Sequence, residues 1–236
     1  MSKLDIINRA LTRIGAETLN DLTGTGKTTK TAVLMYQAGL DFVLRTNPWA
    51  CAVSIVRLKL ASDIVWQGGA TYALDDLCTN DGILYGCKQA GVSAYGVGPD
   101  GITDGITDGS VIWDALDRVD ENFTDYQYIY VYPANCLKVR SVGTGSYLVM
   151  GWFIYSDEED ATANIIKRIF NTDSLDPLLA AAISAKLAEL LAPTFGKMDI
   201  GVQLIQEYQL ALKIARAESA SEAQEDAAPE PRWTDI

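Results

Sequence analysis

The sequence contains no histidine, so it lacks both the commonest zinc ligand and the commonest general base of enzyme sites. Positive charge is also scarce: 19 Lys and Arg stand against 31 Asp and Glu, which gives a net charge of -12. Stable phosphate binding needs clustered Lys and Arg, so this balance argues against nucleic acid as a bound partner. Acidic residues gather in two segments, residues 66–118 and 218–236.

Cysteine is scarce as well, and its spacing does not suggest a metal site. The four residues form no C-x-x-C pair: Cys51, Cys78, Cys87 and Cys136. Residues 1–11 lack the apolar stretch of an export signal, so reduced, mostly buried thiols are expected. Cys78 and Cys87 flank an Asn-Asp-Gly hairpin sequence, which predicts that they lie near each other on two strands.

No long hydrophobic run is free of charge. The most apolar segment, residues 175–195, is long enough to cross a membrane. Asp176, Lys186 and Glu189 interrupt it, and charges at membrane depth are costly. The segment is therefore expected to be a buried helix of a bundle, with no membrane partner.

What the sequence does contain is helical and strand periodicity in separate stretches. Apolar spacing predicts helices over residues 4–14, 27–45, 158–169, 176–194 and 200–223. In the last of these, one stripe could be a core face or a subunit contact. Alternation predicts a strand over residues 52–61 and strand pairs over residues 126–142 and 146–156.

The predicted fold class is α+β and mainly α. A helical-bundle core with a few antiparallel strands is expected in residues 1–61 and 121–218. From about residue 62, aromatic and β-branched residues alternate with turn sequences, which predicts an inserted small all-β domain over residues 62–120. Residues 219–236 are expected to be an extended, flexible acidic tail, because charge and two prolines oppose folding there.

In the stretch GTGKTTK, residues 24–30, Gly26, Lys27 and Thr28 match the last three positions of a phosphate-binding loop pattern. The full pattern G-x-x-x-x-G-K-[ST] also needs a glycine at position 21, which is Asp21. A phosphate loop follows a buried strand, whereas a helix and a polar turn are expected here. A nucleotide hydrolase is therefore the least favoured reading; the turn is expected to cap the next helix, with Thr25 or a neighbour as N-cap and Lys27 in solvent.

Asp-Gly pairs repeat in DGITDGITDG, which places Asp100, Asp104 and Asp108 four residues apart. Calcium loops place their carboxylates two apart, so these pairs predict turns rather than a metal site. No metal or other cofactor is expected. Nothing in the spacing of the other carboxylates selects a pair for glycoside hydrolysis, and no catalytic residue is proposed.

Aromatic residues of the insert leave two readings open. Trp66, Tyr72, Tyr85 and Trp113, with Tyr95, could form a face on which a sugar ring stacks. Such residues are more often the core of a small sheet. The first reading gives the alternative function, a carbohydrate-binding accessory protein that acts through the insert.

Several segments resemble the head-tail connector, or tail tubular protein A, family of short-tailed bacteriophages. The run after the first turn matches its pattern with Ala32, Tyr36, Val43, Leu44, Arg45, Pro48, Trp49 and Ala52. The stretch YPANCLKVRSV is similar to a family strand through Pro133, Cys136, Leu137 and Val139. Two C-terminal helices are similar through Asp176, Pro177, Leu187, Ala188, Leu191, Ala192, Glu207, Tyr208, Ala211 and Ala215.

The resemblance covers roughly residues 1–61 and 121–225. The insert departs from the minimal family and ends in Thr107, Asp108, Gly109, Val111 and Trp113, which resembles small β domains appended to phage structural proteins. Such domains look like surface knobs, for which carbohydrate adhesion is suspected.

The resemblance implies a non-enzymatic adaptor ring of twelve copies between the portal and the tail nozzle protein, with tail fibres as a further contact. DNA would pass through the bore without specific binding. The implied location is the virion neck and tail, and the host cytoplasm during assembly. The tail end, Arg232, Trp233, Thr234, Asp235 and Ile236, is then expected to dock on the portal, with Trp233 and Ile236 as apolar anchors.

Overall fold

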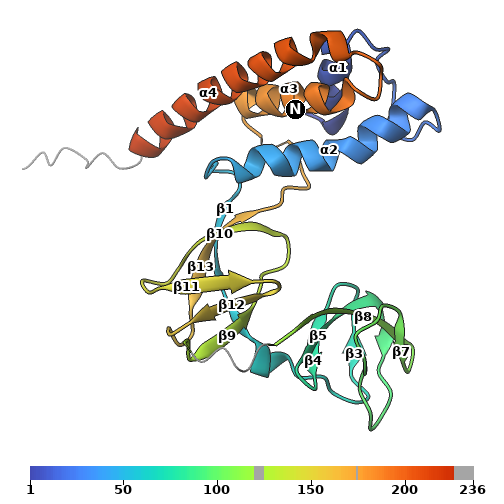
Figure 1. Cartoon of the computed structure of the whole chain (residues 1–236), viewed down its shortest axis with the longest axis vertical. Helices are drawn as coiled ribbons and strands as arrows, with labels where there is room; N and C mark the ends of the chain where they lie inside the picture. The colour runs from blue at the N-terminus through green and yellow to red at the C-terminus, as the bar shows by residue number, and fades with distance from the viewer. Residues whose placement is uncertain (120–124, 174, 226–236) are drawn as a thin grey trace, which may run out of the picture. The chain divides into compact units, whose positions relative to one another are not determined.

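The structure is a computed structural model that describes residues 1–119, 125–173 and 175–225, with side chains described to residue 220 (Figure 1). It divides into two compact units. Unit 1 is Met1–Ser54 with Ile166–Ile236, and unit 2 is Ile55–Ile165. The expected mainly-α class is wrong. Unit 1 is helical, but residues 53–167 form four antiparallel sheets, so a helical bundle accounts for only part of the chain.

Unit 1 is built from four helices that were expected from the periodicity. They are α1 (Lys3–Arg13), α2 (Lys27–Arg45), α3 (Pro177–Leu191) and α4 (Gly201–Glu225), with a 3-10 turn, η2 (Met198–Ile200), before α4. Helix α3 packs against each of the other three (Figure 1). Its high content of small and apolar residues fits that central position, since ten of its side chains are buried.

Local signals fix where these helices begin. Ser2 and Asp5 form a reciprocal capping box at α1, with Asp5 N donating to Ser2 Oγ at 3.1 Å and Ser2 N donating to Asp5 Oδ2 at 3.1 Å. Asp176 caps α3 by accepting from Leu178 N at 2.8 Å, and Pro177 occupies the first turn, where a missing N–H costs nothing.

Unit 2 has a layered arrangement. One layer is a three-stranded sheet in the order β1 (Val53–Arg57), β13 (Thr162–Lys167), β10 (Cys136–Val142). The next is a four-stranded sheet in the order β11 (Tyr147–Met150), β12 (Phe153–Ser156), β9 (Tyr128–Val131), β2 (Lys59–Leu60). The predicted single strand over residues 52–61 is thus two strands, which belong to different sheets.

Alternation along β9 and β12 explains why the four-stranded sheet is buried on both faces. Tyr130 and Ile154 point into a cluster shared with the three-stranded sheet, which we call the inner core: Leu58, Tyr130, Val139, Val142, Ile154, Ala161, Ala163 and Ile165. Their strand neighbours Val131, Phe153 and Tyr155 point the other way, into a cluster shared with the insert. Strands with two buried faces read as continuous apolar runs, and YIYV and FIYS do.

The insert consists of short strands, as expected. A four-stranded sheet has the order β4 (Leu77–Asn80), β5 (Ile83–Gln89), β8 (Val111–Arg118), β7 (Ile106–Asp108). A two-stranded sheet pairs β3 (Thr71–Tyr72) with β6 (Gly91–Val92), and a 3-10 turn, η1 (Ala61–Ile64), leads in. The predicted Asn-Asp-Gly hairpin is confirmed: Asn80 pairs with Ile83 across Asp81 and Gly82, which have φ of 48° and 73°.

Leu84 from β5 lies in one buried cluster with Val131 and Phe153, and Leu77 and Leu116 pack against it; we call this cluster the shared core. The main-chain N–H of Trp152 also donates to Asp117 Oδ2 at 2.8 Å. The insert therefore shares hydrophobic and polar contacts with the sheet that it interrupts, and whether residues 62–120 act as a separate knob stays a prediction.

Three expectations about secondary structure are wrong. Residues 158–169 contain strand β13 rather than a helix: Ala163 and Ile165 alternate into the inner core, and Asp160, at φ 55°, closes a turn just before it. Residues 219–225 continue α4 instead of forming an extended tail. The strands around Pro133, β9 and β10, are both present but belong to different sheets, so they are not the expected pair.

Candidate functional surfaces

The helical unit carries a charged group inside its contact between three helices. Lys186 of α3 has only 7% of its surface exposed. Its ammonium pairs with Glu189 at 2.6 Å and lies over the rings of Phe42, at 4.2 Å from the centroid, and Tyr208, at 5.1 Å. Ion pairing and cation–π contacts both offset the loss of water around the charge. Phe42 belongs to α2 and Tyr208 to α4, so Lys186 holds three helices in one arrangement.

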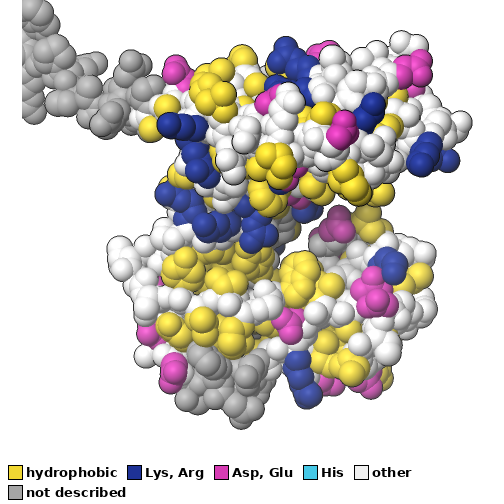
Figure 2. All heavy atoms as spheres, turned by 45° about the horizontal axis from the view of Figure 1, so that its top comes forward, with side chains coloured by type: hydrophobic (Ala, Val, Ile, Leu, Met, Phe, Trp, Pro, Cys, Tyr) yellow, Lys and Arg dark blue, Asp and Glu magenta, His cyan; other side chains and the backbone are white. Residues whose placement is uncertain are grey.

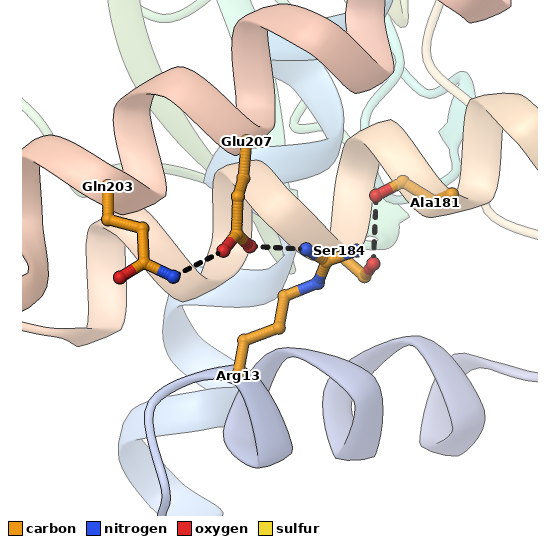
Figure 3. Close-up of polar contacts among 5 residues, drawn as sticks. All are labelled: Arg13, Ala181, Ser184, Gln203 and Glu207. Atoms are coloured by element: carbon orange, nitrogen blue, oxygen red, sulfur yellow. Dashed lines mark hydrogen bonds and ion pairs between the residues drawn. The ribbon is translucent and has the colours of Figure 1, made fainter.

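A second polar contact ties the N-terminal helix to the C-terminal one (Figure 3). Arg13 at the end of α1 donates to Glu207 of α4 at 2.6 Å, and Gln203 donates to the other oxygen of Glu207 at 2.9 Å. Ser184 Oγ donates to the main-chain oxygen of Ala181 at 2.8 Å, which satisfies a hydroxyl within α3. Gln203 is one turn before Glu207 on α4, so only the contact with Arg13 joins two helices, α1 and α4. The burial of Leu204 and Tyr208 places their side of α4 against the helical unit, in which α3 packs against α4.

Helix α4 therefore presents its remaining side chains outward, and several of them are apolar. We call Val202 and Leu210, which lie on the side away from the buried Leu204, Tyr208 and Ala215, the outer face of α4. Ile205 and Ile214 are exposed on the two opposite flanks of the helix, and Met198 of η2 precedes it. Val202 is 71% exposed and Leu210 is 61% exposed. Figure 2 shows separate hydrophobic groups on the surface of the helical unit, among polar and charged side chains. Such groups on one helix are typical of a surface that contacts another protein.

Helix α3 also passes a length and composition test for a membrane span: residues 177–195 have a mean hydropathy of 1.5, and 61% of that window is buried within the protein. The same test is passed by core helices of bundles.

A small pocket of about 210 Å³ lies in unit 1 between the end of α2, the start of α3 and the last turns of α4. Trp49, Cys51, Leu179 and Ala215 are among its lining residues. Burial raises the pKa of the Cys51 thiol, and the nearby Asp176 adds to this. Thiolate is the reactive form, so this cysteine is not activated as a nucleophile.

The loop before α2 has no phosphate cradle. Asp21 Oδ1 accepts from the hydroxyl of Thr23 at 2.8 Å, from Thr23 N at 2.8 Å and from Gly24 N at 2.9 Å. The hydrogen bond from the hydroxyl first, and then the two from the main chain, lower the pKa of Asp21. A carboxylate thus occupies the amides that an anion would need. The N-cap of α2 is Gly26, the neighbour of Thr25, so the expectation that this turn caps the helix is confirmed; Gly26 has no side chain, and the cap makes no side-chain hydrogen bond.

Asp108 organises the inside of the insert. It is 4% exposed, and its Oδ2 accepts from the indole of Trp66 at 2.7 Å and from the indole of Trp113 at 3.2 Å. Its Oδ1 accepts from Ala94 N at 2.7 Å. Both carboxylate oxygens are therefore engaged by protein donors, which satisfies a buried charge.

The four residues considered for sugar stacking lie in or against the same cluster. Tyr85 and Trp113 are fully buried in it, and Trp66 and Tyr72 are partly buried against it. Tyr72 contacts Trp113 edge-on, with ring centroids 4.8 Å apart. A ring without exposed surface cannot stack on a sugar, so Tyr85 and Trp113 have a core position. The exposed aromatic of this region is Tyr95, which is 87% exposed.

The repeated Asp-Gly pairs form turns, with Gly101, Gly105 and Gly109 all at positive φ. Asp100 and Asp104 are exposed, whereas Asp108 is buried, so the repeat does not converge on one point. Within residues 1–119, 125–173 and 175–225, no group of three or more Asp, Glu, Cys or His residues is arranged to hold a metal ion.

The thiols of the insert are free and both lie in its core: Cys78 on β4 and Cys87 on β5. Burial first, then the Asp108 carboxylate and Cys87, raise the pKa of Cys78 from 9.0 to about 12.

The thiol of Cys78 loses its proton near pH 9 in the unfolded chain but keeps it in the folded protein. We therefore expect the free energy of unfolding to fall as pH rises between 9 and about 12. Urea unfolding of Cys78→Ala should show a shallower loss over that range; equal slopes for both proteins would contradict this.

The residues expected to dock on a portal, 232–236, lie outside the described residues. Sequence reasoning missed Lys186 and Asp108 as organising groups, because neither type is expected inside a protein and neither has a spacing signal. From the sequence, the apolar stripe of the helix over residues 200–223 was assigned to either a core face or a subunit contact. The structure buries Leu204 and Tyr208 and leaves Ile205 at 42% exposure, so both uses remain open on one helix.

In comparisons with known proteins, the chain matches no protein-family model and no curated protein.

Proposed function

We propose that this chain is a structural adaptor of a bacteriophage neck, of which several copies form a ring between the portal and the tail nozzle protein. It works by binding other proteins rather than by catalysis. The observation that carries the proposal is the outer face of α4, where Val202 and Leu210 are exposed on a helix whose other side packs against α3. The resemblance of this helix and of α2 to the connector family supports the same assignment.

Apolar side chains that stay exposed in the single chain favour association, since burial of apolar surface contributes about 25 cal/mol per Å². In a ring, each copy presents such a surface to the next copy or to the protein above or below. The buried contacts of Lys186 with Phe42 of α2 and Tyr208 of α4 support this use, because a helix that is already packed in the single chain loses less entropy on binding.

The net charge of -12 supports a channel that DNA passes without binding. Like charges repel, and few cations are present to replace the counterions of the phosphates. Under this proposal, the ring belongs to the virion, and the chain is in the host cytoplasm during assembly.

The test is co-expression of the chain with the portal and nozzle proteins of the same genome, followed by purification and electron microscopy. We expect the wild-type chain to form a ring on the portal. Val202→Asp combined with Leu210→Asp places charges on the outer face of α4, and we expect loss of the ring with an unchanged melting temperature. Leu74→Asp is the control, because Leu74 is also 61% exposed but lies in the insert.

Rings that form equally well with all three chains would show that the outer face of α4 is not the contact. Failure of the wild-type chain to join the portal, together with its absence from purified virions, would overturn the adaptor function itself.

A further inference from the structure

Unit 2 carries a small basic face on a strongly acidic protein. In the three-stranded sheet, Val139 of β10 and Val56 of β1 pack toward the inner core. Neighbouring residues of a strand point to opposite faces, so Lys138 and Arg140 of β10 point away from that core, as do Ile55 and Arg57 of β1. We call these four residues the basic face; all are exposed.

The charges of the basic face are only partly neutralised. Arg57 pairs with Asp160 at 2.6 Å, in an exposed contact of the kind that contributes little to stability. Among the described residues, Lys138 and Arg140 form no ion pair. Ile55 lies on the same side of β1 as Arg57, with 73% of its surface exposed, and β13 separates β1 from the strand of Lys138 and Arg140. An apolar side chain among cations suits contact with a protein better than contact with phosphates, because a phosphate backbone gives it nothing apolar to bury against.

The insert provides a surface of the opposite sign. Asp81 is at the tip of the β4–β5 hairpin, and Asn80 of the same hairpin donates to the main-chain oxygen of Pro99 at 3.1 Å. Asp100 follows at once, and the hydroxyl of Tyr85 donates to the main-chain oxygen of Gly101 at 3.0 Å. These bonds bring the hairpin tip and the loop at 99–101 together around Tyr85.

Asp104 is placed near the same surface by its neighbour Thr103. The main-chain oxygen of Thr103 accepts from Ala115 N at 3.3 Å, and Ala115 is the strand partner of Tyr85. The pKa of Tyr85 fits this placement: burial raises it first, and the carboxylates of Asp100 and Asp81 are among the further causes. Between these acids lies Ile102, which is 79% exposed. We call Asp81, Asp100, Ile102 and Asp104 the acidic face.

The two faces match in composition but cannot meet within one chain. The basic face lies on the outer side of the three-stranded sheet. The inner core, the four-stranded sheet and the shared core all lie between that sheet and the insert. Each face also has an exposed isoleucine on the same element as a charge of that face, Arg57 for Ile55 and Asp100 and Asp104 for Ile102, so a second copy offers both charge and apolar complementarity.

We propose that the basic face of one copy binds the acidic face of the next copy, an inference that rests on the proposed ring. Because the two faces differ, the contact is heterologous, and repetition of a heterologous contact closes into a ring when the rotation between copies allows it. Lys138 and Arg140 pair with Asp100 and Asp104, while Ile55 and Ile102 bury each other's side chains.

Charge reversal tests this arrangement. Lys138→Glu with Arg140→Glu makes the basic face acidic, and Asp100→Lys with Asp104→Lys makes the acidic face basic. We expect each double variant alone to lose the ring on the portal, as judged by electron microscopy. An equimolar mixture of the two double variants should recover the ring, because every contact in an alternating ring again joins opposite charges. The quadruple variant should recover it for the same reason.

Rescue separates this contact from misfolding and from nucleic acid. If the double variants were misfolded, mixing would not restore assembly, and the proposal would be overturned. If the basic face binds DNA instead, Lys138→Glu with Arg140→Glu would abolish retention of a duplex oligonucleotide at low salt, and the mixture would not rescue the ring. If each double variant alone forms the same ring as the wild-type chain, the basic and acidic faces are not the contact between copies. That result would leave the adaptor function unaffected. No ring from the wild-type chain would count against the adaptor function instead.

Discussion

Asp108→Ala is expected to destabilise unit 2 by about 4 kcal/mol, since loss of an acceptor costs about 1–3 kcal/mol for each buried donor left behind. Three donors lose their acceptor: the indoles of Trp66 and Trp113 and the main-chain N–H of Ala94. The side chain is 4% exposed, so water cannot easily replace it. Urea unfolding followed by tryptophan fluorescence would measure the change, because both indoles lie in the insert.

The matched control is Asp104→Ala, four residues earlier in the same repeat. Asp104 is exposed, and substitutions at such positions usually change stability by less than about 0.5 kcal/mol. Similar losses in the two variants would mean that the contacts of Asp108 are not what stabilises the insert.

Gly109→Ala is the second large effect, with an expected loss of about 2–5 kcal/mol from a left-handed backbone and an overpacked contact combined. Gly109 has φ of 64°, and a Cβ there would overlap the main-chain oxygen of Val92 and lie 2.7 Å from Ala94 N. Both are backbone atoms, so neither can move aside as a side chain would.

Gly105→Ala separates the two causes, because Gly105 also has positive φ, at 75°, but a Cβ there would meet nothing within 4 Å. We expect only the conformational part, about 1–2 kcal/mol. The comparison is made by thermal unfolding of both variants at the same pH. Equal losses would show that crowding against the main chain of residues 92–94 contributes nothing.

These two predictions show where the sequence stops being informative. Asp-Gly occurs three times within DGITDGITDG, and turn chemistry is expected at each. The structure confirms three turns but gives only the third a buried carboxylate. That choice depends on Trp66 and on Ala94, residues that are distant in the sequence, and no local pattern encodes it.

Helices were easier to predict than the strands around them. Ser2 with Asp5, and Asp176 with Pro177, are cap sequences that act over a few residues, so α1 and α3 could be placed from the sequence. Strand β13 was not, because Ile165, Ile166 and Ile169 fit a helical spacing as well as a strand. Its partners β1 and β10 settle the ambiguity, and they come from residues far away in the chain.

The candidate surfaces could be predicted only in part. The periodicity of α4 indicated one apolar stripe, but the exposure of Val202 and Leu210 depends on which side faces α3. The basic face was missed because Lys138 and Arg140 lie in a strand whose partners were not known, and the overall charge of -12 hides a local excess of cations.

The shared core has a consequence for how this chain could be recombined. A domain that is joined to its host only by its two chain ends can be moved to another protein without exposing apolar surface in either. Here, excision of residues 62–120 would leave Val131, Phe153 and Tyr155 without cover on one side of their sheet. A relative without the insert must therefore carry polar side chains at those three positions, or another segment must cover them. Transfer of this insert to another protein requires an apolar surface there that packs against Leu84 and its neighbours.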